Sequence, residues 1–216
     1  MGQITLVRHG QANSKARTEE EYDRLSELGA LQARRLGDYL RQTGESFDLV
    51  LRGTLNRHDA TAREMGEMGA AVEVDARLNE MDYLTLGRAL QDKKGIAQPG
   101  PDAFMDHFIQ VLTAWKQAEI NGQETYESFE TRIAGVLDAA TQPGRRVLCV
   151  TSGGVIAMMI RHLLRLDLPA MARVALPIYN TSLHRIDVTP RGAVLSGYNS
   201  IPHLADPAHV DLRSYY

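Results

Sequence analysis

Four short stretches of the sequence carry side chains that could together bind a phosphate group. The first is Arg8-His9-Gly10, which follows an apolar run, and the others carry Arg57, Glu80 and Ser152-Gly153-Gly154. Guanidinium groups offer planar, bidentate donors to phosphate or carboxylate, and the start of a helix adds backbone N–H groups for the same charge. If the four stretches meet, they form an anion site. Its predicted phosphate-binding residues are Arg8, Arg57, Ser152 and Gly153.

A histidine between two arginines points to chemistry as well as binding. The arginines disfavour a charged imidazolium, and a neutral imidazole held near phosphorus offers a nitrogen lone pair for nucleophilic attack. Gly10 lets the backbone pass close to a ligand, because no Cβ stands in the way. A carboxylic acid such as Glu80 could protonate the leaving oxygen and later deprotonate water. His9 and Glu80 are therefore the predicted catalytic residues.

Each of these residues also has a plain structural explanation. Arg8 and His9 could form an ordinary polar strand end, and Arg57 alone is typical of a solvated first turn of a helix. Ser152 before two glycines is a good N-cap, which explains the serine without any chemistry. His58 lies about 100° around the helix from Arg57, so we expect it on the surface or behind the site.

The order of the predicted elements places the four stretches at one edge of a sheet. Runs rich in branched residues predict strands at 3–8, 47–52, 71–75, 145–151, 181–188 and 193–198. Apolar residues at helical spacing predict helices at about 26–43, 54–68 (with Thr54 as N-cap), 102–119, 127–141 and 153–166. Such alternation is typical of a mostly parallel sheet whose strands carry functional groups at their carboxyl ends. We predict a three-layer α/β/α sandwich with an antiparallel edge strand, because the last two strands are close enough for a hairpin.

One domain over residues 1–216 is expected, with an excursion over the active-site edge at about 84–119. The part from 84 to 101 breaks the helical pattern with glycines, lysines and two prolines. We expect this excursion to shape the substrate pocket.

Composition and charge narrow the functional classes. The chain is 44% hydrophobic and 24% charged with a net charge of −3, which is ordinary for a globular protein and leaves no basic stripe for nucleic acid. It shows no leader peptide and no apolar run of about 18 residues, so we expect a cytoplasmic protein that does not bind membranes. Cys149, without a partner in an apolar run, is expected to be buried in a strand. No metal-ligand spacing is present, and we expect neither a metal nor a cofactor.

The motifs resemble those of the histidine phosphatase superfamily, which includes the cofactor-dependent phosphoglycerate mutases. LVRHGQA (6–12) is similar to the family signature, and TLNRHDATA (54–62) is similar to the segment with its second arginine. RLNEMD (77–82) resembles the segment with the acid/base glutamate, and VLCVTSGGVI (147–156) resembles the turn with the second histidine. The segments 25–40 and 198–204 also resemble family segments.

The resemblance implies a phosphohistidine at His9, with Arg57 as the second arginine and Glu80 as the acid/base residue. One departure stands out, because this chain has Ser152 where the family usually has a histidine before paired glycines. The family's imidazole donates to a phosphoryl oxygen, whereas serine offers only a neutral hydroxyl. The departure bears on the rate and on the range of substrates.

Three functions stay open at this point. The first is a phosphoric monoester hydrolase that acts through His9 on a small phosphate ester. The second is a serine hydrolase, because Ser152 lies at a strand–turn–helix and Asp187 and His203 follow in the required order, although the glycine expected at position 150 is a valine. His203 is otherwise expected to be structural. The third is a phosphate-binding module with weak or lost turnover.

Overall fold

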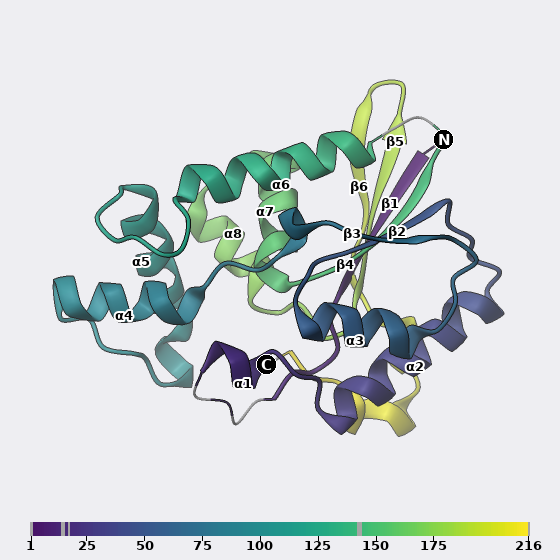
Figure 1. The fold of residues 1–216 in the computed structure, drawn as a ribbon, viewed down its shortest axis with the longest axis horizontal. Helices are drawn as coiled ribbons and strands as arrows, with labels where there is room; N and C mark the ends of the chain where they lie inside the picture. Colours follow the sequence, from purple (N-terminus) through teal and green to yellow (C-terminus); the bar gives the residue numbers. More distant parts are fainter. Residues whose placement is uncertain (1, 14–15, 17, 142–143, 216) are drawn as a thin grey trace.

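The computed structural model describes residues 2–13, 16, 18–141 and 144–215 of the chain. Its centre is a six-stranded sheet in the order β3-β2-β4-β1-β5-β6 (Figure 1). The strands are β1 (Gly2–Arg8), β2 (Leu49–Arg52), β3 (Val72–Val74), β4 (Arg146–Thr151), β5 (Leu183–Thr189) and β6 (Gly192–Ser200). Strands β1 to β4 are mutually parallel, which confirms the predicted mostly parallel sheet.

The predicted antiparallel edge strand is confirmed, because the edge strand β6 pairs antiparallel with its neighbour β5. Strand β5 runs against the others, and it lies second from the edge, between β1 and β6. A two-residue turn after β5 reverses the chain again, so the edge strand β6 has the direction of β1. A turn this short can join only antiparallel neighbours, which explains why the hairpin supplies two strands of opposite direction.

Helices of very different lengths connect the strands. The longer ones are α2 (Glu27–Gln42), α3 (Asn56–Met65), α4 (Tyr83–Lys94), α5 (Phe104–Lys116), α6 (Tyr126–Ala140), α7 (Gly153–Leu164) and α8 (Leu168–Ala175). The shorter ones are α1 (Glu19–Tyr22) and the 3-10 turns η1 (Ala76–Leu78), η2 (Pro101–Ala103), η3 (Pro202–Leu204) and η4 (Pro207–Leu212). Within the described ranges, none of these helices has the length and apolar character needed to cross a bilayer.

The helices cover both faces of the sheet, which confirms the predicted three layers. Along β1, the side chains of Ile4 and Leu6 pack into one core and that of Val7 packs into the other. The first core takes side chains from α5, α6, α7 and α8, and the second takes side chains from α2 and α3. In Figure 1, α6 lies above the strands, and α2 and α3 lie below them. Alternate residues of a strand point to opposite faces, so burying both faces requires helices on each side.

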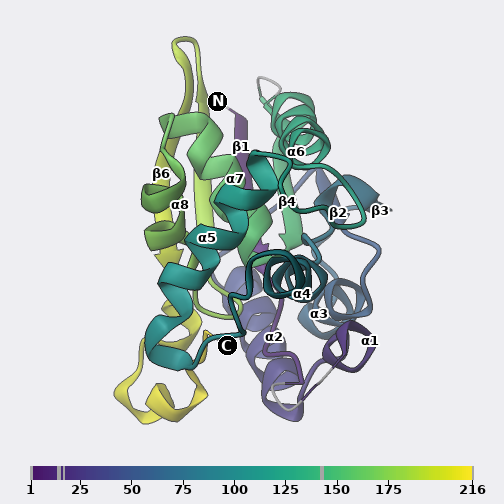
Figure 2. The ribbon, with the colours of Figure 1, turned by 90° about the vertical axis from the view of Figure 1, so that its left-hand side faces the viewer.

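The excursion predicted to break the helical pattern contains helix α4. Its N-cap is Asp82, whose carboxylate accepts the amide N–H of Thr85 at 3.0 Å. Leu86 and Leu90 face the core, and Gly95 ends the helix in the left-handed region with φ 69°. The lysines and glycine that suggested a loop therefore belong to a normal helix end, since a C-terminal glycine adopts positive φ without strain. Figure 2 shows α4 and α5 on the viewer's side, in front of β1 and β4.

The register of β1 and β4 sets up the site. Arg8 pairs with Thr151 at the end of the two strands, so His9 and Ser152 are the first residues beyond them. The amide N–H of His9 still donates to the carbonyl of Thr151 at 2.9 Å. Two neighbouring parallel strands thus deliver His9 and Ser152 to the same edge of the sheet.

Candidate active site

A pocket of about 420 Å³ opens at the carboxyl edge of the sheet. The predicted site residues that line it are Arg8, His9, Arg57, Glu80 and Gly153. Their segments are far apart in the sequence, and the parallel strand ends bring them together as expected. Ser152 is not among the residues that line this pocket, because its side chain lies behind the wall.

His9 is a neutral imidazole with a fixed orientation. The side chain is 2% exposed, and its Nδ1 lies 2.8 Å from the carbonyl oxygen of Gly10. A carbonyl can only accept, so Nδ1 carries the hydrogen and Nε2 keeps its lone pair. Burial, followed by the charges of Arg57 and Arg8, lowers the pKa of His9 well below its usual value, and the bond to Gly10 opposes this only in part. The pocket therefore holds an uncharged imidazole with one free nitrogen lone pair.

Arg57 is held at the start of α3 by a carboxylate from another segment. The side chain is 1% exposed, and its Nη1 lies 3.1 Å from Oδ1 of Asp23. The same carboxylate accepts the amide N–H groups of Asn56 at 2.8 Å and of Arg57 at 3.1 Å. The predicted N-cap Thr54 is wrong, because the N-cap position is Leu55, which makes no side-chain cap. Asp23 takes over this role, and no local pattern in the sequence indicates it.

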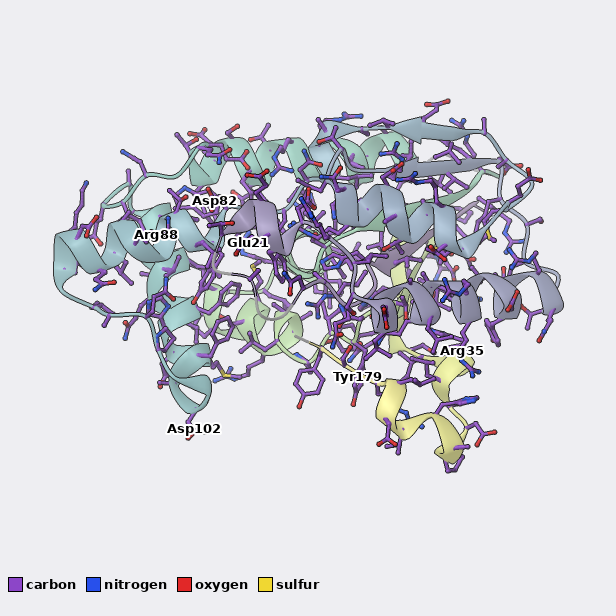
Figure 3. All side chains as sticks on the ribbon, turned by 60° about the horizontal axis from the view of Figure 1, so that its bottom comes forward. Glu21, Arg35, Asp82, Arg88, Asp102 and Tyr179 are labelled. Atoms are coloured by element: carbon purple, nitrogen blue, oxygen red, sulfur yellow. The ribbon has the colours of Figure 1, made fainter. Side chains whose placement is uncertain are left out.

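Arg8 is anchored by backbone carbonyls of the C-terminal part of the chain. Its Nη1 donates to the carbonyl oxygen of Ile178 and, at 2.9 Å, to that of Tyr215. The rings of Tyr179 and Tyr215 meet edge to face with 5.5 Å between their centroids. Tyr179 is labelled in Figure 3, close to the C-terminal segment drawn in yellow. The C-terminal segment therefore completes the wall of the site, which the sequence did not predict.

Glu80 has a carboxyl group that retains its proton more readily than usual. Oε2 accepts the amide N–H of Gly154 at 2.8 Å, and Oε1 accepts that of Met81 at 3.0 Å. Burial raises the pKa of Glu80, while these two bonds and the charges of Arg57 and Arg8 act in the opposite direction. A Cβ on Gly154 would overlap Oε1 of Glu80, so a larger residue at this contact would displace the carboxyl group. The arrangement suits a proton donor at the wall of the pocket.

Ser152 and His58 form a buried pair that the sequence did not predict. Ser152 occupies the N-cap position of α7, yet its hydroxyl makes no cap bond and lies 2.7 Å from Nε2 of His58. Both side chains are buried, at 1% and 0% exposed. The rings of His58 and His9 lie 5.8 Å apart between centroids. A surface position for His58 is therefore wrong, and its alternative, a position behind the site, is confirmed.

The other residues considered for a serine hydrolase bond elsewhere. Asp187 accepts a hydrogen bond from the side chain of Gln3 at 2.8 Å, on β5. His203 is buried, with its Nε2 2.8 Å from the hydroxyl of Thr181, and burial lowers its pKa to about 4. Ser152 has His58 as its partner instead. Ser152, Asp187 and His203 therefore do not form the catalytic triad of a serine hydrolase.

Part of the pocket wall is apolar and aromatic. Tyr83 of α4 packs against Phe104 and Phe108 of α5, with ring centroids 5.5 and 5.7 Å away. The two phenylalanine rings stack with 6.3 Å between centroids. Leu84 and Leu176 extend this surface along the pocket. In the described part of the chain, no group of three or more His, Cys, Asp and Glu side chains is arranged to hold a metal ion.

Comparisons with known sequences identify a family. The sequence profile of the histidine phosphatase superfamily (branch 1) matches residues 4–201. A 2,3-bisphosphoglycerate-dependent phosphoglycerate mutase of Azorhizobium caulinodans is 28% identical over 178 residues, covering 76% of this chain and 82% of the relative. A protein of the same name from Rhizobium etli is 26% identical over 197 residues, covering 86% of this chain and 91% of the relative.

Solved structures share the fold. A phosphoserine phosphatase of Entamoeba histolytica in complex with 3-phosphoglyceric acid has a TM-score of 0.69 at 19% identity, covering 94% of this chain and 100% of that chain. An alpha-ribazole phosphatase of Shigella flexneri has a TM-score of 0.66 at 23% identity, covering 92% and 96%. The family profile spans nearly the whole chain and includes the described residues that line the pocket, apart from Tyr215. The chain belongs to the histidine phosphatase superfamily, branch 1.

Proposed function

We propose that this protein is a metal-independent phosphomonoester hydrolase that acts through a phosphohistidine at His9. One observation carries the proposal: the Nδ1–H of His9 is committed to the carbonyl of Gly10, so a neutral Nε2 lone pair remains in a pocket lined by two arginines. Nucleophilic catalysis needs this state of the imidazole, and anion binding alone does not.

In the proposed reaction, Arg8, Arg57 and the N–H of Gly153 hold the phosphoryl oxygens. His9 Nε2 attacks phosphorus, and the bond from phosphorus to the leaving oxygen breaks while Glu80 protonates that oxygen. The Glu80 carboxylate then takes a proton from water, which attacks the phosphohistidine. The P–N bond breaks, inorganic phosphate leaves, and His9 and Glu80 return to their starting protonation states.

The apolar part of the pocket wall supports a substrate with an apolar or aromatic leaving group. Tyr83, Phe104 and Phe108 line the pocket and offer it aromatic surface. The only cationic side chains among the described residues that line the pocket are Arg8 and Arg57. Both are assigned to the phosphoryl oxygens, so the aromatic surface is left to bind the rest of the substrate. The described lining therefore supports an apolar monoester as the substrate of the proposed hydrolysis.

The test is phosphate release from phenyl phosphate and from phosphoglycerate, with and without a chelator. We expect turnover of phenyl phosphate that a chelator does not change, and no turnover by His9→Ala. Mutase activity with 3-phosphoglycerate and 2,3-bisphosphoglycerate exceeding the hydrolysis rate would contradict the proposal. Phosphate binding without turnover would indicate a binding module, and cleavage of aryl esters that is lost in Ser152→Ala would indicate a serine hydrolase.

A further inference from the structure

The hydrogen bond between His58 and Ser152 joins two elements directly behind the nucleophile. His58 is the third residue of α3, and Ser152 follows β4, next to the end of β1. Gly53 makes room for the imidazole, because a Cβ there would overlap its Nδ1. The backbone of Gly53, the residue after β2, is thus fitted to a ring from the next helix.

The partners of His58 determine which of its nitrogens carries the hydrogen. Nε2 lies 2.7 Å from Oγ of Ser152, and Nδ1 has no hydrogen-bond partner in the described part of the chain. Burial and the neighbouring charges of Arg57 and Arg52 lower the pKa of His58 well below its usual value, so the ring carries a single N–H. A buried donor without an acceptor is costly, which places the hydrogen on Nε2, where Ser152 accepts it.

A serine that accepts from His58 keeps its own hydrogen to donate. Among the described residues, Ser152 Oγ has His58 as its one hydrogen-bond partner. Ser152 is 1% exposed and does not itself line the pocket, but the adjacent Gly153 does, and the ring of its partner His58 lies 5.8 Å from that of His9 between centroids, so the hydroxyl adjoins the site from behind His9. The group that belongs there in the proposed reaction is the phosphoryl group.

We propose that His58 is a positioning residue: its Nε2–H holds the Ser152 hydroxyl as a neutral donor to the phosphoryl group at His9. The identity of the substrate in this inference rests on the proposed function, and the identity of the donor rests on the geometry of the Ser152–His58 pair. His58 does not touch the substrate and acts through Ser152. If the pair were only structural, the two side chains would support the fold without acting together on phosphate.

A double-mutant cycle tests this coupling, with two readouts. The variants are Ser152→Ala, His58→Leu, their combination, and His58→Gln, whose amide can still donate to Ser152. The readouts are the rate of phosphoenzyme formation in a single turnover of phenyl phosphate and the Kd of orthovanadate by calorimetry. Ser152→Ala and His58→Leu should each reduce the rate by roughly three- to tenfold, the size of one neutral hydrogen bond. The combination should be no slower than either single change, and His58→Gln should stay within about twofold of the parent.

A matched control is available in the pair of Ser182 and His184. Their Oγ and Nε2 lie 3.0 Å apart, both residues are fully buried, and neither lines the pocket. His184→Leu should lower the free energy of unfolding as His58→Leu does, with little change in the phosphoenzyme rate. If His58→Leu does not fold, Ser152→Ala and His58→Gln still form the comparison.

The outcomes separate this inference from the proposed function. The inference would be overturned if the rate reductions of the two single variants multiply in the double variant, or if His58→Gln is as slow as His58→Leu. Turnover by the parent would still support the hydrolase in that case. A parent that binds vanadate without turnover, but shows the same coupled pattern in Kd, would overturn the hydrolase and support the donor pair. If the parent shows no turnover and the variants show no coupling in the Kd of vanadate, the hydrolase and the donor pair are both overturned.

Discussion

Asp23 binds Arg57 twice, because Oδ1 of its carboxylate lies 3.1 Å from the guanidinium Nη1 and 3.1 Å from the backbone nitrogen of the same residue. The other carboxylate oxygen accepts the amide N–H of Asn56 at 2.8 Å. One side chain therefore caps α3 and fixes the direction of the arginine that it presents to the pocket. The Tyr22 ring adds a contact, with its centroid 5.0 Å from Cζ of Arg57.

Replacing Asp23 should weaken both the helix start and the phosphate site. Asp23→Ala removes the cap and leaves a buried guanidinium without this carboxylate, so we expect the free energy of unfolding to fall by about 1–3 kcal/mol. The Kd for phosphate should rise, because Arg57 loses its orientation, and Asp23→Asn should lie between Ala and the parent. Urea unfolding and calorimetry measure the two effects. Tighter phosphate binding by Asp23→Ala would show that Asp23 competes with the ligand instead of positioning Arg57.

A methyl group at Gly154 should impair the proton donor selectively. The added Cβ would overlap Oε1 of Glu80 and lie 2.6 Å from Cε of Met81, so the carboxyl group must shift. We expect kcat for an alkyl phosphate to fall by about 10², and that for 4-nitrophenyl phosphate by much less, because nitrophenolate leaves without a proton.

Gly153→Ala is the matched control for Gly154→Ala. A Cβ at Gly153 would lie 3.7 Å from Nε of Arg8, an ordinary contact that leaves Glu80 in place. Gly153→Ala should lower kcat less than Gly154→Ala does, and by the same factor for the alkyl phosphate and for 4-nitrophenyl phosphate. An equal loss on both substrates in Gly154→Ala would exclude Glu80 as the donor to the leaving oxygen.

The dependence of kcat/KM on pH should be bell-shaped. His9 attacks only when neutral, and its lowered pKa keeps it neutral down to pH values well below the ordinary histidine range. Glu80 donates only when protonated, and its raised pKa keeps the proton at higher pH than an ordinary glutamic acid. Activity is therefore lost on the acid side as His9 gains a proton, and on the basic side as Glu80 loses one.

Glu80→Gln should remove the basic limb of this profile and lower the rate by about 10²–10⁴, the usual contribution of a general acid. The acid limb should stay, because His9 is unchanged. Glu127→Gln, an exposed glutamate on α6, serves as the control and should leave the profile unaltered. A basic limb that persists in Glu80→Gln would assign the proton donor to another group.

A histidine placed at position 152 would be crowded by His58. Ser152 and His58 are both fully buried and 2.7 Å apart, so a second imidazole would overlap the first. Ser152→His alone should therefore lower stability by about 1–3 kcal/mol and should not raise activity. The double variant Ser152→His/His58→Ala restores the space for the new imidazole. Its kcat/KM should exceed that of Ser152→His by about tenfold, the contribution of one charge-assisted bond to a phosphoryl oxygen. His58→Ala alone is the control, and equal rates in the single and double variants would show that crowding by His58 is not the obstacle.

Local patterns in the sequence determined the framework of this protein. Apolar runs marked the strands, helical spacing marked most of the helices, and their alternation implied a parallel sheet with functional groups at its carboxyl edge. Arg8, His9, Arg57 and Glu80 could be assigned to one site because each follows or adjoins a strand end. The helix α4 was also within reach, since Asp82 three residues before Thr85 and Gly95 after Lys94 are ordinary cap signals.

Only the tertiary structure decided what supports these residues. Asp23 reaches a helix start 33 residues further along, His58 meets Ser152 across 94 residues, and the carbonyl of Tyr215 meets Arg8 across 207. None of these pairs has a periodic or adjacent pattern, because each arises from the packing of elements whose relative position is set by the whole sheet. A side chain such as Ser152 has several possible partners within its own helix turn, and the fold selects the one that is buried beside it.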